Sequence, residues 1–154
     1  SERAAGRLRL DPATVYSIAD VLDPDVEARI GAGFGVPVGQ VYQATEGFLG
    51  ITCAAGRLHL NEDLLHVEAE PLGAGRFVPV VTDLYRRTQA VVRYRLGDVL
   101  VAADGPCRCG SALLGVRRVE GRHDDALLLD REGGGTGTCF ADLVRGAVLG
   151  PVKE

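Results

Sequence analysis

The chain has 154 residues, the size of one ordinary domain, and its 46% hydrophobic and 25% charged residues are typical of a globular protein, not of a disordered segment. Seventeen Lys and Arg against 21 Asp and Glu give a net charge of −4, so we expect it to bind neither nucleic acid nor an anionic membrane. The N-terminal residues do not form a signal peptide, and no apolar run approaches the ~20 residues that span a bilayer, which predicts a cytoplasmic protein. Four cysteines are too few for a disulfide scaffold, which leaves a metal site or inert core thiols.

The first predicted elements are a strand and a helix. The run TVYSI favours a strand because of its β-branched and aromatic residues. The following DPDVEARIGAGFG predicts a helix, with Asp23 as N-cap, Pro24 as the first helical residue and the glycines from Gly31 to Gly35 ending it. Because GAGFG closes a helix instead of opening one after a strand, it does not fit a dinucleotide-binding loop.

Between Val36 and Gly121 the pattern changes to short extended runs separated by turns, which predicts an antiparallel, barrel-like β region. The runs are VGQVYQ, FLGITC, GRLHL, LLHVEAE, RFVPVVTDLY, QAVVRYR, DVLVAA and LLGVRRVEG. Further on, ALLLD predicts a strand, and CFADLVRGAVL predicts a helix with Cys139 on its buried side. The REGGGTG between them lacks the Lys-Ser/Thr ending of a phosphate loop, so we interpret it as a connector.

Three short blocks carry side chains suited to nucleotide chemistry. YQATEG, from Tyr42 to Gly47, combines a ring that can stack on a base, a hydroxyl for a phosphate oxygen and a carboxylate for Mg²⁺. RYRLGD ends on Asp98 at a turn, where a carboxylate can accept bonds from adjacent ribose hydroxyls. EGRHDD joins an arginine to two aspartates where the β-rich region ends. Each block alone also fits an ordinary turn or polar linker.

In this order, and together with LHLNED, FVPVVTDLYRRTQ and PCRCG, the blocks resemble the adenylate-forming superfamily of acyl- and aryl-CoA ligases. The closest resemblance is to the branch with phenylacetate-CoA ligases and deazaflavin-coenzyme adenylating synthetases. The resemblance implies catalytic roles for Thr45, Glu46 and Arg122. It implies the following contacts: Tyr42 against adenine, Thr45 with phosphate, Glu46 with Mg²⁺, Asp98 with the ribose hydroxyls, Arg122 with the ribose or α-phosphate, and Asp124 as the hinge of the C-terminal domain.

The resemblance also implies the fold class and the domain organisation. The fold would be α+β and β-rich: residues 1–47 end an α/β nucleotide-binding subdomain, 48–120 form a distorted antiparallel β-barrel-like subdomain, 121–125 are the hinge, and 126–154 begin a small α+β C-terminal domain. Three features depart from the family. Ala19-Asp20 stands where the family has an Ala-Glu at the adenine pocket, and the triphosphate loop and C-terminal lysine are missing. We therefore expect the parent protein to be an AMP-forming ligase and this portion alone to be inactive.

The implied cofactors are ATP or AMP and Mg²⁺, and the implied substrate is a small molecule, either a carboxylic acid or a deazaflavin coenzyme, with CoA as an open choice of acceptor. Pyrophosphate would be the leaving group. The alternative function is a non-catalytic, zinc-stabilised β module that binds a nucleotide or a protein. The two hypotheses differ in whether the three blocks form a catalytic nucleotide site.

In the same branch, some members hold a structural zinc ion through Cys and His residues. The matching residues here are Cys53, His59, Cys107 and Cys109, a Cys₃His set of the kind that closes a tetrahedral zinc site. The single residue between the last two cysteines is tighter than the usual zinc spacing, so inert turn thiols remain an alternative, and redox use is a third. We expect His66 and His123 to be solvated.

Overall fold

The computed structural model describes residues 5–7, 9–19, 21–130 and 133–140. Within these ranges, no helix has the length and the apolar character that crossing a membrane would require.

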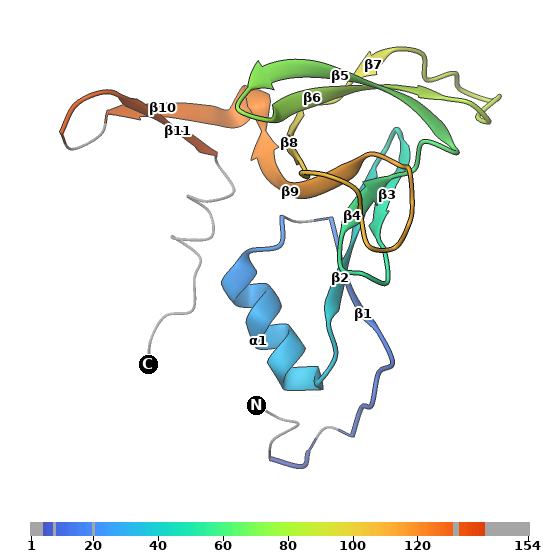
Figure 1. Ribbon diagram of the computed structural model, residues 1–154, viewed down its shortest axis with the longest axis vertical. Helices are drawn as coiled ribbons and strands as arrows, with labels where there is room; N and C mark the ends of the chain where they lie inside the picture. Colours follow the sequence, from blue (N-terminus) through green and yellow to red (C-terminus); the bar gives the residue numbers. More distant parts are fainter. Residues whose placement is uncertain (1–4, 8, 20, 131–132, 141–154) are drawn as a thin grey trace.

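One mixed sheet of nine strands organises the described chain (Figure 1). The strands are β1 (Val15–Ile18), β2 (Val38–Ala44), β3 (Gly47–Thr52), β4 (Leu58–Leu60), β5 (Leu65–Gly73), β6 (Arg76–Asp83), β7 (Tyr94–Arg95), β8 (Asp98–Ala102) and β9 (Gly115–Arg122). Their order is β1-β2-β3-β4-β9-β8-β6-β5, with β7 also paired to β6. Among these described strands, β1 and β2 pair in parallel and the other pairs of the sheet are antiparallel.

The β-rich α+β fold class predicted from the sequence is confirmed, but the sheet is open and does not close into a barrel. Nearly all the predicted extended runs form strands. The exception is QAVVRYR, of which only Tyr94 and Arg95 belong to a strand. β2 and β3 pair directly as antiparallel neighbours, with a register shift between Tyr42 and Gln43, so the strands on both sides of residue 47 belong to one sheet.

The helix α1 (Pro24–Phe34) starts where the sequence predicts. Asp23 Oδ1 accepts the amide N–H groups of Asp25 and Val26 at 2.8 and 3.3 Å, and Pro24 occupies the first turn, where no donor is needed. Its end differs from the prediction, because the helix continues through Gly31 to Phe34. A glycine inside a helix costs only about 1 kcal/mol, whereas the left-handed cap falls on Gly35, at φ 74°.

Apolar residues from the strands and the segments that join them form the core in three clusters. The first joins Leu49, Leu65, Val81, Val91 and Leu96, the second joins Leu58, Leu60, Phe77, Leu100 and Val116, and the third joins Val78 and Val99. Full burial of one such side chain contributes roughly 1.5–3 kcal/mol. Tyr42 packs against both of the larger clusters, so its backbone position on β2 is held by the core on either side of it.

After β9 the chain leaves the sheet. A short 3₁₀ turn, His123–Asp125, leads into β10 (Ala126–Asp130), which pairs with β11 (Thr136–Phe140) in a separate two-stranded sheet. In Figure 1 this hairpin extends away from the nine-stranded sheet. Gly133 to Gly135, just before β11, all have positive φ, which suits a tight turn.

The sequence predicts a helix that begins at Cys139, and this predicted start is wrong. Cys139 and Phe140 are strand residues that pair with Leu127 and Ala126. The β-favouring composition of TGTCF and an antiparallel partner in ALLLD explain the strand. The remainder of that predicted helix lies outside the described residues.

Candidate functional site

A pocket of about 540 Å³ opens beside β2, between the end of β1 and the paired strands β8 and β9. It brings together five of the residues singled out from the sequence: Tyr42, Thr45, Glu46, Asp98 and Arg122. The other lining residues are Ser17, Ala19, Val21, Gln40, Val41, Gln43, Ala44, Tyr94, Leu96, Gly97, Val119 and Gly121. Asp124 is not among the lining residues; it lies in the exposed turn after β9.

Tyr42 and Asp98 are joined directly inside the pocket. The Tyr42 hydroxyl donates to Asp98 Oδ2 at 2.7 Å. Burial first, and then the charge and hydrogen bond of Asp98, raise the pKa of Tyr42 above its usual value. The phenol is therefore a protonated donor throughout the neutral range.

A second phenol and carboxylate of the pocket lining also meet. A hydrogen bond to Glu46, followed by the charge of the same carboxylate, raises the pKa of Tyr94. Tyr94 is not among the site residues predicted from the sequence. The available signal was strand periodicity, because Tyr94, Leu96 and Asp98 are two residues apart and all three line the pocket.

Arg122 supplies the positive charge of the pocket. Asp98 and Arg122 are register partners on β8 and β9. The guanidinium lies over Gly97, where an added Cβ would be 2.7 Å from Arg122 Nη2 and 3.1 Å from Nε. Its charge acts on both Tyr42 and Tyr94, so this cation stands within electrostatic reach of both phenol–carboxylate pairs.

Arg86, which is not a lining residue of the pocket, stabilises the turn that carries Thr45 and Glu46. Arg86 Nη1 and Nη2 each donate to the Thr45 carbonyl oxygen at 3.3 Å. Asp83 Oδ1 accepts the amide N–H groups of Tyr85 and Arg86 at 2.8 Å each, and these bonds lower the pKa of Asp83. Arg86 was not predicted as a site residue either, because in the sequence it is one surface cation among several.

Ala19 forms the edge of the pocket after β1 and has φ 80°. A left-handed backbone at a residue other than glycine costs about 1 kcal/mol or more, so the surrounding structure must hold it. Asp20, the second residue of the Ala19-Asp20 pair compared with the adenine pocket, lies outside the described residues.

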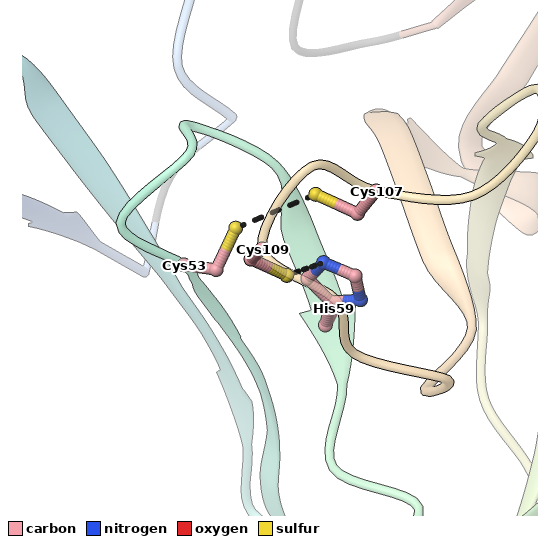
Figure 2. Close-up of side chains that lie close together, drawn as sticks. All are labelled: Cys53, His59, Cys107 and Cys109. Carbon is pink, nitrogen blue, oxygen red and sulfur yellow. Dashed lines mark hydrogen bonds between the residues drawn. The ribbon is translucent and has the colours of Figure 1, made fainter.

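A separate cluster contains the four residues proposed as metal ligands. One ligand atom each of Cys53, His59, Cys107 and Cys109 lies within 4.8 Å of all the others. Figure 2 shows the four side chains facing one another: Cys53 follows β3, His59 is on β4, and the other two cysteines lie in the loop between β8 and β9. His59 and Cys107 are buried.

Two spacings within this cluster agree with those of a tetrahedral zinc site. Zinc bonds of about 2.3 Å to sulfur and about 2.0–2.1 Å to nitrogen place two tetrahedral sulfurs about 3.8 Å apart and a sulfur and a nitrogen about 3.5 Å apart. The Sγ atoms of Cys53 and Cys107 are 3.7 Å apart, and Cys109 Sγ is 3.5 Å from His59 Nε2. His59 Nδ1 is 3.0 Å from the Leu113 carbonyl oxygen, and a bond donated there leaves Nε2 as the free ligand.

Two turns of the same kind present the sulfurs. In CAAG (53–56) and CRCG (107–110), the glycine N–H donates to the cysteine carbonyl at 2.9 and 3.0 Å, and the glycine φ is 82° and 78°. Each cysteine sulfur accepts the backbone N–H of the residue two positions later. The donors are Ala55 for Cys53, Cys109 for Cys107 and Ser111 for Cys109. The repeated Cys-x-x-Gly spacing is a stronger sequence signal than the Cys-x-Cys pair.

These bonds favour the thiolate form at two of the three cysteines. At Cys109 the N–H of Ser111 lowers the pKa, but the hydrogen bond with Cys107 and burial outweigh it, and the net shift is upward. The N–H of Cys109, followed by His59, lowers the pKa of Cys107 to about 6. Burial raises the pKa of Cys53, but the N–H groups of Arg57 and Ala55 outweigh it and the net shift is downward. Because the thiolate is the metal-binding form, the cluster has the chemistry of a metal site as well as its spacing.

No protein-family model and no curated protein matches this sequence. The structure is similar to crystal structures of 2-hydroxyisobutyryl-CoA ligase (HCL). The postadenylation state with R3-HIB-AMP has 18% sequence identity and a TM-score of 0.71, over 86% of this chain and 31% of HCL. An open conformation with 2-HIB-AMP and CoA has 19% identity and a TM-score of 0.66, over 87% of this chain and 31% of HCL. The thioesterification state with 2-HIB-AMP and CoA has 21% identity and a TM-score of 0.62, over 73% of this chain and 27% of HCL.

The chain thus spans about a third of the length of HCL. Sequence identities of this size establish a shared fold and nothing finer. The protein therefore has the fold of the matched part of 2-hydroxyisobutyryl-CoA ligase.

Proposed function

We propose that this chain is part of an ATP-dependent adenylate-forming ligase and that its pocket binds the AMP portion of the nucleotide. The observation that carries the proposal is the pocket itself, which gathers Tyr42, Thr45, Glu46, Asp98 and Arg122 from three separate sequence blocks. The HCL structures support it, because they contain the adenylates R3-HIB-AMP and 2-HIB-AMP.

The proposed roles follow from the chemistry of the side chains. Asp98 would accept the ribose hydroxyls, with the Tyr42 ring against adenine and the Arg122 guanidinium at the ribose or α-phosphate. Thr45 and Glu46 would face the phosphates, and the hard carboxylate of Glu46 fits Mg²⁺, which would neutralise phosphate charge there. The reaction would be attack of a substrate oxygen on the α-phosphorus with release of pyrophosphate, for which these residues supply positioning and charge.

The substrate and acceptor are further parts of the proposal. HCL is a CoA ligase, which favours a carboxylic acid and CoA over a deazaflavin coenzyme. The hinge would be residues 121–125, with Asp124 in the short turn that separates the nine-stranded sheet from the β10–β11 hairpin. The other predicted domain limits, the phenylacetate-CoA ligase branch and the cytoplasmic location stay predictions.

We also propose that Cys53, His59, Cys107 and Cys109 hold one structural zinc ion. Four protein ligands would leave no coordination position for water, so the ion would take no part in the reaction. Its role would be to tie the loop between β8 and β9 to the turn after β3. β8 carries Asp98 and β9 carries Arg122. The ion would therefore stabilise the strand pair on which the nucleotide contacts depend.

Nucleotide binding is the direct test of the proposed function. We expect the 154-residue chain to bind AMP weakly in titration calorimetry and Mg·ATP to raise its melting temperature. In the longer protein, ATP–pyrophosphate exchange should be abolished by Glu46→Ala, because the phosphates would lose their metal ligand. Glu27→Ala on the exposed helix α1 is the matched control. Exchange that survives Glu46→Ala would exclude this assignment of the site.

The zinc proposal has a test that needs no activity. Purified protein should contain one equivalent of zinc, and a chelator should abolish cooperative unfolding, because assembly of the site is coupled to folding. Cys109→Ser should remove the metal, whereas Cys139→Ser, in β11 and outside the cluster, should retain it. A metal-free preparation that melts like the untreated protein would rule the site out.

The alternative function is a non-catalytic zinc-stabilised β module, and the complete Cys/His cluster is the observation that favours it. It predicts tight binding of a partner protein with no effect of AMP or ATP on the melting temperature. A nucleotide-dependent rise in melting temperature that Asp98→Asn abolishes would decide for the ligase.

A further inference from the structure

The hydroxyl group of Tyr42 has no role in stacking on a base. A phenylalanine ring offers the same aromatic face, yet this position carries a phenol whose oxygen lies 2.7 Å from Asp98 Oδ2. The two residues are 56 positions apart, on β2 and β8. Since Tyr42 packs against both large core clusters, its hydroxyl is held in place by the core.

Asp98 sits between two groups that compete for its oxygens. Arg122 is its register partner on β9, and a direct guanidinium–carboxylate pair would use both oxygens in a bidentate contact. The guanidinium lies instead over Gly97, while the Tyr42 hydroxyl bonds Oδ2. A carboxylate has about four acceptor sites, so one bond from Tyr42 leaves enough for two further hydroxyl donors.

From this geometry we infer that the Tyr42 hydroxyl is a positioning group: it orients the Asp98 carboxylate toward a ribose diol and so makes the pocket selective for ribonucleotides. The inference rests on the proposed nucleotide function and adds to it the source of sugar selectivity. The raised pKa of Tyr42 is consistent with it, because the phenol stays a donor at neutral pH.

The test compares AMP with 2′,3′-dideoxy-AMP, which keeps the base and phosphate and lacks the diol. Wild-type chain should bind AMP at least about tenfold more tightly, the usual value of hydrogen bonds to a charged group. Tyr42→Phe should weaken AMP binding by a similar factor and leave dideoxy-AMP binding unchanged, so the preference collapses. In an Asp98→Asn background, Tyr42→Phe should have no further effect on the ratio, because the two residues act as one unit.

The failures are distinguishable. If the wild type binds neither nucleotide, both the proposed function and this inference fall. If it binds both equally, nucleotide binding stands and ribose selection is overturned. If Tyr42→Phe lowers affinity for the two nucleotides by the same factor, the hydroxyl serves packing or folding and is not a sugar-positioning group. Two-dimensional NMR spectra of the variant, unchanged outside the pocket, would establish that it remains folded.

Discussion

Gly97 is a residue whose lack of a side chain determines the position of a charge. A Cβ there would lie 2.7, 3.1 and 3.3 Å from Nη2, Nε and Cζ of Arg122, all in the flexible end of that side chain. We predict that Gly97→Ala displaces the guanidinium and weakens AMP binding by about tenfold, as Arg122→Ala would, since a charged contact is lost. Titration calorimetry measures the effect.

The fold should tolerate this change, because the displaced atoms belong to a long side chain and not to the backbone. Gly33→Ala, in α1, is the matched control: nothing lies within 4 Å of the added Cβ, and alanine favours a helix. Equal AMP affinity in Gly97→Ala and wild type would show that Arg122 does not need its place over Gly97.

At the scale of elements, the turn after β6 is stabilised by a charged cap. The amide N–H of Tyr85 and that of Arg86 lower the pKa of Asp83, which therefore lies below the unfolded value of about 3.9. A depressed carboxyl pKa contributes stability that is complete above the unfolded pKa and lost as the pH falls through the folded one.

We therefore predict that Asp83→Asn lowers the melting temperature at pH 7 by about 2–4 °C, the shift expected for about 1 kcal/mol in a domain of this size. The difference from wild type should shrink as the pH approaches 3. Thermal melts from pH 7 to pH 3 measure it, with exposed Asp63→Asn as the control. A difference that stays constant over this range would contradict the charged-cap explanation.

The elements that the sequence predicts correctly are those set by local chemistry. Asp23 and Pro24 define the start of α1, and apolar alternation between turn residues defines most strands. Long-range pairing could not be predicted in this way. The open sheet depends on registers such as Leu58 with Val116, and Cys139 is in a strand because it pairs with Leu127.

The same distinction holds at the candidate sites. The four Cys/His residues and five pocket residues come from sequence blocks whose side-chain types suit their chemistry, and the fold brings each set together. Tyr94 and Arg86 were missed because their roles depend on contacts with Glu46 and the Thr45 carbonyl, far away in the sequence. Side-chain type alone does not reveal a positioning contact.

For the whole molecule, the turn His123–Asp125 separates two sheets that differ in burial. In the nine-stranded sheet, Val99 and Leu100 are almost fully buried, at 1% and 0% exposure, whereas Leu128 of β10 is 74% exposed. Ala126 is the residue that packs the start of the hairpin against Val78 and Val99. An isolated two-stranded hairpin is marginally stable in water, because it buries little apolar surface.

We therefore predict that the amides of β10 and β11 exchange with deuterium at least about tenfold faster than those of β6 and β8, because local opening is easiest where few apolar groups are buried. Hydrogen-exchange mass spectrometry on the 154-residue chain measures this. Metal removal should accelerate exchange most in β4 and in the loop between β8 and β9, where the cluster lies. Equal protection in hairpin and sheet would contradict the lower local stability inferred for the hairpin from its exposed apolar side chains.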